Sequence, residues 1–199
     1  LRYQIDAAPR DGSQAPALIW LGDADSDPSA ELKRLKELHG SGVTIVVVEQ
    51  TYSAGKGGEW LATDHRIEDL SVLDFALDRL REQLLLHYDI DPQRCLLAGT
   101  GAGVEVILTS AAGDPEWSQA MVATRSGPGW FGMEGLSEAP DEAHPGPGVH
   151  VIGVADHEAA WKREVSARKE AGEPMQWTLC DDEGDPEAVL HQMIQDQWR

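Results

Sequence analysis

The chain has 199 residues, of which 41% are hydrophobic, and this length fits one domain over 1–199 with a continuous core. Its formal net charge of −19 excludes nucleic acid as an expected partner, because phosphate backbones are held by clustered Lys and Arg. No stretch reaches the roughly 20 apolar residues that a membrane-spanning helix needs, so we expect no membrane span.

Short apolar runs alternate with longer segments of helical period, and this alternation is typical of βαβ units around a parallel sheet. The predicted buried strands are 17–21, 43–48, 95–98, 120–123, 149–154 and 175–180. The predicted helices are 28–39, 67–87, 102–112, 158–171 and 186–198. Asp27 is the expected N-cap of the first helix, ahead of Pro28, and Gly172 suits the end of the fourth. The sequence therefore predicts an α/β fold, a three-layer α/β/α sandwich with a mostly parallel central sheet.

Two glycine-rich stretches, 51–66 and 126–148, show neither the helical nor the strand spacing of apolar residues. They are predicted to be loops. In open α/β sheets, loops at the carboxyl ends of the strands are where ligands bind. Trp60, Trp130 and Phe131 lie in these stretches. Packing of these aromatic rings onto the sheet is favoured over an exposed binding surface.

The cysteines and histidines carry no sign of a metal or redox site. Cys95 and Cys180 each fall in a predicted buried strand, where a small hydrophobic role is expected and a disulfide is not. The seven histidines show no metal-ligand spacing, so no zinc site and no cofactor are predicted. The chain begins at Leu1 without a signal-like segment, which leaves the compartment open with the cytoplasm favoured.

Residues 94–104 predict a strand, a tight glycine turn and a helix. Gly99, Gly101 and Gly103 keep the spacing of the Gly-x-Ser-x-Gly nucleophile elbow, with glycine in place of the serine. Around this turn the chain resembles the phospholipase/carboxylesterase branch of the α/β-hydrolase superfamily, which includes the acyl-protein thioesterases. The other segments that carry the resemblance are 17–22, 91–94, 123–127 and 151–156.

The resemblance implies a Ser–His–Asp triad, and in this sequence two of its three roles are vacant. Asp156 falls at the acid, Gly101 at the nucleophile, and Asp185 nearest to the histidine, because the segment 181–185 contains no histidine. Loss of a nucleophile or base removes most of a triad's acceleration. We therefore expect a catalytically inactive homologue, a pseudoenzyme that acts as a binding, accessory or assembly protein.

A vestigial pocket is expected around the elbow, lined by Asp23, Thr100, Ala102, Ser126 and His157. The Ala102 amide would be an oxyanion donor, and the nearby carboxylate of Asp23 would disfavour developing negative charge there. The alternative is an atypical esterase or thioesterase with relocated catalytic residues. In that alternative His157 would activate the hydroxyl of Ser126 or Thr100.

The glycine turn has a second functional interpretation, a cradle for phosphate on the amides of a helix N-terminus. The dinucleotide pattern needs glycine where Val104 stands and an acid where Arg125 stands, so this interpretation is disfavoured.

Acidic residues should gather at the carboxyl end of the sheet. Asp23, Asp25 and Asp27 have the alternate spacing of a calcium loop, but Pro28 stands where such a loop needs glycine, which favours a solvated turn. Asp156 and Asp185 should approach each other, with a shared proton, a cation, a basic side chain or water between them. We expect a protein partner, of basic character, or weak divalent-cation binding, and homo-oligomers stay open.

Overall fold

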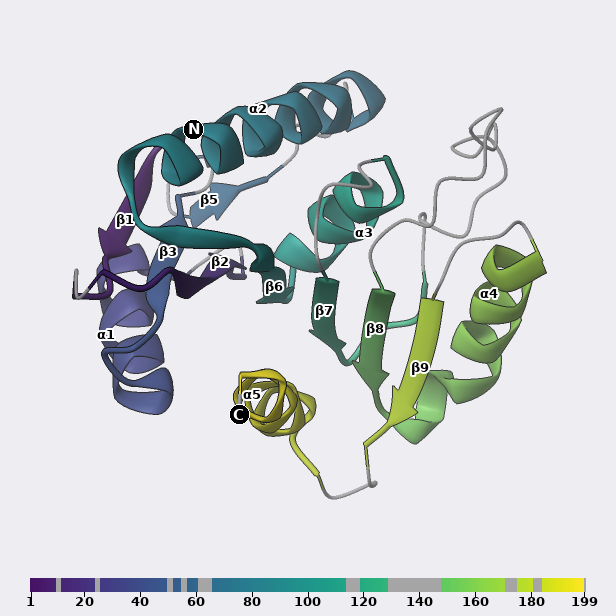
Figure 1. Cartoon of the computed structure of the whole chain (residues 1–199). Coiled ribbons are helices and arrows are strands. Elements are labelled where there is room, and N and C mark those ends of the chain that lie inside the picture. The colour runs from purple at the N-terminus through teal and green to yellow at the C-terminus, as the bar shows by residue number, and fades with distance from the viewer. Residues whose placement is uncertain are drawn as a thin grey trace.

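The computed structural model describes residues 1–9, 12–23, 26–49, 52–54, 57–60, 66–113, 119–128, 148–170, 175–180 and 184–198. Its centre is a seven-stranded sheet in the order β1-β3-β2-β6-β7-β8-β9 (Figure 1). Neighbouring strands are parallel except β1 and β3, which are antiparallel. The strands are β1 (Tyr3–Asp6), β2 (Ala15–Leu21), β3 (Thr44–Val48), β6 (Ile90–Thr100), β7 (Gln119–Thr124), β8 (Gly148–Gly153) and β9 (Met175–Leu179).

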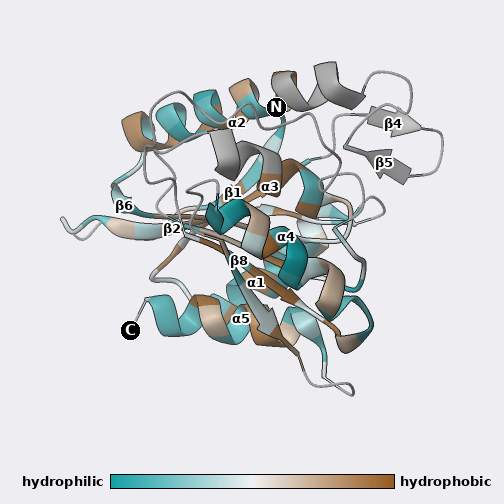
Figure 2. Ribbon diagram, turned by 90° about the vertical axis from the view of Figure 1, so that its right-hand side faces the viewer, coloured by the Kyte–Doolittle hydropathy of each residue, from teal (hydrophilic) through white to brown (hydrophobic). Residues whose placement is uncertain are grey.

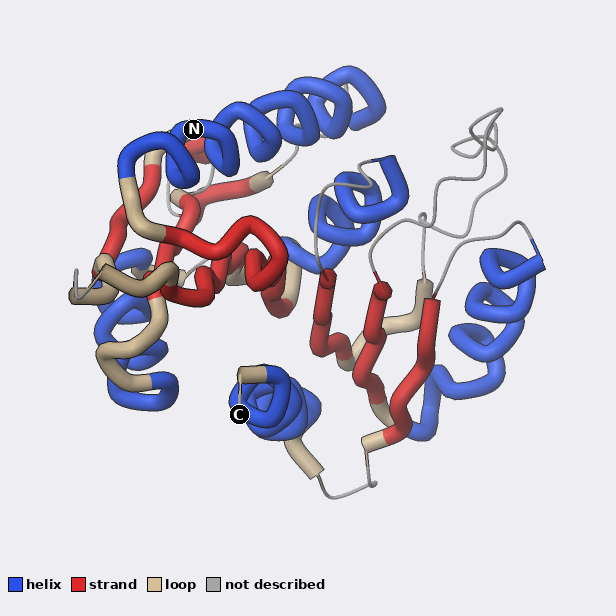
Figure 3. Tube along the Cα trace, viewed as in Figure 1, coloured by secondary structure: helices blue, strands red, loops and turns tan. Residues whose placement is uncertain are grey.

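Helices cover both faces of this sheet (Figure 3). They are α1 (Pro28–His39), α2 (Arg66–His87), α3 (Gly103–Gly113), α4 (Glu158–Glu170) and α5 (Pro186–Gln197), and a short 3₁₀ turn, η2 (Ala155–His157), precedes α4. One core cluster joins the sheet to α2, α3 and α4, and a second joins its other face to α1 and α5. The apolar strands lie between these two helical layers (Figure 2), so the predicted three-layer α/β/α sandwich is confirmed.

The sequence explains why these elements form where they do. The Asp27 side chain accepts the N–H of Ser29 at 3.0 Å and Pro28 opens α1, as predicted. Strand β3 is a run of β-branched residues, buried along its whole length, as expected for a strand covered on both faces. In β2, Ile19 and Leu21 face one core cluster while Trp20 faces the other, which is the alternation of a strand.

The structure differs from the predicted elements in two places. Strand β1 was not predicted, because its Tyr-Gln-Ile-Asp sequence mixes polar and apolar residues, and these are only half-buried at the sheet edge. The stretch 51–66 was predicted to be a loop, but it contains a hairpin of β4 (Tyr52–Ala54) and β5 (Gly57–Glu59). Gly172, expected after α4, lies outside the described residues.

Cys95 and Cys180 are buried and form no disulfide with each other, as predicted. Burial raises the pKa of the Cys95 thiol to about 11, so this side chain stays a neutral hydrophobe at neutral pH. In the part of the chain that the structure describes, no helix combines the length and the apolar character required to cross a bilayer.

Candidate functional site

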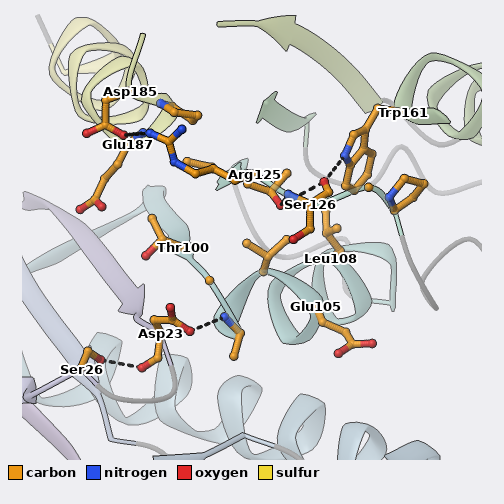
Figure 4. A pocket seen from close by; sticks show the side chains of 18 of the residues that line it. Asp23, Ser26, Thr100, Glu105, Leu108, Arg125, Ser126, Trp161, Asp185 and Glu187 are labelled. Atoms are coloured by element: carbon orange, nitrogen blue, oxygen red, sulfur yellow. Dashed lines mark hydrogen bonds and ion pairs between the residues drawn. The ribbon is translucent and has the colours of Figure 1, made fainter. Parts of the chain in front are cut away.

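A cavity of about 740 Å³ opens at the carboxyl ends of β2, β6 and β7, beside the start of α5 (Figure 4). Five carboxylates line it, from Asp23, Glu31, Glu105, Asp185 and Glu187. Arg125 is the only basic residue among the described residues of the lining. The cavity therefore lies where the sequence placed the pocket, and its wall carries an excess of negative charge.

The elbow, residues 99–103, packs directly against the end of β2. A Cβ atom on Gly99 would lie 2.0 Å from the carbonyl oxygen of Leu21, and one on Gly103 would lie 2.5 Å from the same atom. Gly101 has a φ of +56°, in the left-handed region that favours glycine. The glycine spacing is thus required by the close approach of two backbone segments and by the tight turn.

Asp23 lies over this turn, two residues beyond the end of β2. Its Oδ1 accepts the backbone N–H of Ala102 at 3.1 Å (Figure 4). A Cβ atom on Gly101 would lie 2.3 Å from Cγ of Asp23. The amide that the resemblance assigned to an oxyanion hole is therefore hydrogen-bonded to a carboxylate.

Hydrogen bonds on both sides hold the turn that carries Asp23. The N–H and the hydroxyl of Ser26 donate to the carbonyl oxygen of Asp23, at 3.1 and 2.8 Å. The indole Nε1–H of Trp60 donates to the carbonyl oxygen of Gly22 at 2.9 Å, and this tryptophan is buried in the core. The favoured packing role of Trp60 is confirmed, whereas Trp130 and Phe131 lie outside the described residues.

Asp185, the nearest match to the triad histidine, is the N-cap of α5 and accepts the N–H of Glu187 at 3.2 Å. Its carboxylate also pairs with the guanidinium of Arg125 at 3.3 Å, across the mouth of the cavity. The predicted carboxylate at this position thus has a basic side chain as its partner. Residues 181–183 of the same loop lie outside the described residues.

Asp156 and His157 form the turn η2 between β8 and α4 and are not among the described lining residues of the cavity. Asp156 is exposed. The His157 ring lies beside Gly127, where a Cβ atom would be 3.3 Å from Nδ1. Among the hydrogen bonds of the described residues, none joins His157 to a hydroxyl of Thr100 or Ser126. Of the predicted site residues, the cavity brings together Asp23, Thr100, Gly101, Ala102, Ser126 and Asp185.

A polar network between α1 and α5, which the sequence analysis did not predict, forms one side of the cavity. Arg34 pairs with Glu31 at 2.7 Å and with Glu187 at 2.6 Å, and its guanidinium lies 2.9 Å from Nε2 of His191. The hydrogen bond from His191 lowers the pKa of the Glu187 carboxyl. The network fixes Glu31 and Glu187 in the lining.

His39 extends this network away from the cavity. Its Nε2 lies 3.2 Å from Nδ1 of His191, and the His191 ring stacks on Trp20. Burial, with the nearby His191 and Arg34 charges, lowers the pKa of His39 to about 4. The local signals for this network were the helical spacings of Glu31 with Arg34 and of Glu187 with His191.

No group of three or more His, Cys, Asp or Glu residues within the described ranges is arranged to hold a metal ion. Asp25 and the acids at 181–183 lie outside those ranges. A phosphate at the elbow would meet the Asp23 carboxylate, so the geometry also disfavours a phosphate cradle.

No family model and no curated protein matches the sequence. Solved structures do match it. A carboxylesterase from Bacillus cereus aligns with a TM-score of 0.71 at 11% identity, over 98% of this chain and 94% of that one. Acyl-protein thioesterase 2 from Zea mays aligns with a TM-score of 0.66 at 14% identity, over 100% and 99%.

Esterase PE8 is a third similar structure, with a TM-score of 0.70 at 14% identity over 97% of both chains. At identities this low the likeness establishes the fold alone. The chain has the α/β-hydrolase fold, as the resemblance predicted.

Proposed function

We propose that this chain is a non-catalytic α/β-hydrolase homologue that acts by binding a partner or ligand in the cavity at the elbow. The observation that carries the proposal is Gly101, which offers no side-chain atom at the nucleophile position. Covalent catalysis by this fold needs an activated nucleophile with a base in hydrogen-bond reach. The nearest match to the base position is Asp185, which caps a helix and pairs with Arg125.

The charge of the cavity favours a cationic ligand, such as an ammonium or guanidinium group on a basic protein segment. Five carboxylates line the cavity against two guanidinium groups that pair with them, those of Arg125 and Arg34, so negative charge remains in excess. The formal charge of −19 over the whole chain acts in the same direction at long range. Complementary charge steers association and disfavours acidic partners.

An ester hydrolysis assay tests the non-catalytic part of the proposal. Purified protein should hydrolyse short p-nitrophenyl esters and thioesters at the rate of buffer alone. Turnover above that rate which is lost in Asp156→Ala would contradict the proposal, because Asp156 is the one triad position that kept its residue type.

Titration calorimetry with spermidine as a probe tests the binding part. The double variant Glu105→Gln/Asp185→Asn removes two carboxylates of the lining and should weaken spermidine binding by about tenfold or more. Asp156→Asn/Glu37→Gln is the matched control, since it removes two exposed carboxylates outside the described lining. Equal loss in both variants would show that only overall charge matters.

The proposal includes weak binding of a divalent cation as a second form of positive ligand. Calcium or magnesium that binds the folded state raises the thermal midpoint beyond sodium chloride at equal ionic strength. The excess shift should be smaller in Asp185→Asn than in the unmodified protein. If millimolar calcium or magnesium raises the thermal midpoint no further than sodium chloride does, divalent cations are not ligands of the cavity. The proposal then holds for organic cations only.

A further inference from the structure

The elbow of this fold has two positions that a ligand or a side chain could occupy, and here one carboxylate takes both. The first is the space beside Gly101, where a Cβ atom would lie 2.4 Å from Oδ1 of Asp23 and 2.6 Å from its Cβ. The second is the backbone N–H of Ala102, which donates to that same Oδ1. Asp23 comes from a different element, 79 residues earlier in the chain than Ala102.

We propose that Asp23 is a built-in plug of the elbow, which closes it to any external carbonyl or carboxylate group. An external group that accepted the Ala102 N–H would have to displace a carboxylate already bonded there. A negatively charged group would also meet the charge of Asp23 at contact distance, and this repulsion costs free energy.

Hydrogen bonds hold the backbone of Asp23 and of the residue before it. Ser26 holds the carbonyl of Asp23 with two hydrogen bonds, and Trp60 holds the carbonyl of Gly22 from the core. The Ser26 hydroxyl packs closely on Gly22, where a Cβ atom would lie 2.5 Å from its Oγ. The carboxylate also sits at the N-terminal end of α3, where the helix dipole favours a negative charge.

Removal of the plug should therefore leave a site for a small carboxylate. The variant Asp23→Ala vacates a space the size of a carboxylate and frees the Ala102 amide. Formate carries the same group that the side chain supplied and is small enough to replace it. This inference does not depend on what binds elsewhere in the cavity, so it can fail or stand separately from the proposed function.

Thermal melting in sodium formate and in sodium chloride at equal ionic strength tests the plug. Asp23→Ala should melt about 2–6 °C below the unmodified protein, as expected for loss of a charged hydrogen bond at a helix start. Formate should recover a measurable part of this loss beyond chloride. The control is Asp27→Ala, which also removes an exposed carboxylate bonded to a helix-start amide, but one at the start of α1 and outside the described lining of the cavity.

The plug is supported if formate raises the melting temperature above its value in chloride for Asp23→Ala alone. It is overturned if this rise is equal in the unmodified protein, Asp23→Ala and Asp27→Ala. A second measurement needs no variant and covers the case in which Asp23→Ala does not fold. Amide hydrogen exchange in the unmodified protein should show the Ala102 N–H protected, as a bonded amide is. Exchange of that amide at the rate of an open amide in the folded protein would overturn the plug.

Discussion

At the scale of single residues, each glycine of the elbow is required by a specific neighbour. Gly99 and Gly103 accommodate the carbonyl of Leu21, and Gly101 accommodates the side chain of Asp23. The glycine at position 101 is therefore tied to the presence of a carboxylate from the loop after β2. A side chain at position 101 and the observed position of Asp23 are mutually exclusive.

The variant Gly101→Ser should be destabilised and still inactive toward esters. Its side chain overlaps Asp23 and adds a residue other than glycine at positive φ, which together cost about 2–4 kcal/mol. Urea denaturation measures the loss in the free energy of unfolding. If the proposed function is right, an ester assay of this variant shows no turnover, because a hydroxyl at position 101 restores no base at Asp185.

A matched control separates the two costs of that variant. Gly12 has a φ of +90° and nothing within 4 Å of a Cβ atom, so Gly12→Ala measures the backbone cost without overlap. The double variant Asp23→Ala/Gly101→Ser should be more stable than the sum of the two single losses predicts. Strict additivity would show that the two positions do not interact.

At the scale of the elements, short sequence patterns predicted the features that depend on neighbouring residues, such as helix starts and core-facing helix sides. The Asp27–Pro28 pair marked the start of α1, and leucines at helical spacing marked α2, because caps and core faces depend on neighbouring residues. The hairpin of β4 and β5 had no such signal in its glycine-rich sequence. Periodicity cannot identify a strand with so few apolar residues.

The contacts that define the site are non-local, and the sequence could not reveal them. The candidate set included both Asp23 and Ala102, but nothing indicated that a carboxylate would bond to that amide from 79 residues away. His39 and His191, 152 residues apart, fall on two separate predicted helices, and nothing in the sequence indicates that their rings meet. Only the packing of α1 beside α5 brings them together.

The free energy of unfolding should depend on pH through His39, which the packing of α1 beside α5 partly buries. Its pKa of about 4 in the folded protein lies below the ordinary value of 6.5. Between these pH values the His39 ring is protonated in the unfolded chain and neutral in the folded one. Stability is retained above pH 6.5 and is lost as pH falls toward 4. We expect a loss on the order of 1–2 kcal/mol, because solvent screens the partly buried ring.

Urea denaturation across this range should show a smaller loss in His39→Gln than in the unmodified protein. His150→Gln is the necessary comparison, because burial lowers the pKa of His150 too and acts in the same direction. Below pH 4.5 the lowered pKa of Glu187 adds a further loss as its carboxylate is protonated. An unchanged profile in His39→Gln would assign the effect to other groups.

At the scale of the whole molecule, the dominant property is its negative charge. A formal charge of −19 on 199 residues destabilises the compact state by self-repulsion. Sodium chloride should therefore raise the thermal midpoint progressively as the screening length shortens. A midpoint that stays flat or falls with salt would mean that attractive ion pairs, such as those of Arg34, outweigh the repulsion.

The wall of the cavity includes a tryptophan, Trp161, whose indole N–H donates to the carbonyl oxygen of Ser126 at 2.8 Å. Its ring is buried and stacks on Trp177, with ring centroids 5.7 Å apart. Indole emission is sensitive to the polarity and hydrogen bonding of its surroundings, and a ligand that moves the segment at Ser126 changes both. Trp161 thus serves as an intrinsic fluorescent reporter, and the emission change that Trp161→Phe abolishes measures occupancy of the cavity without any label.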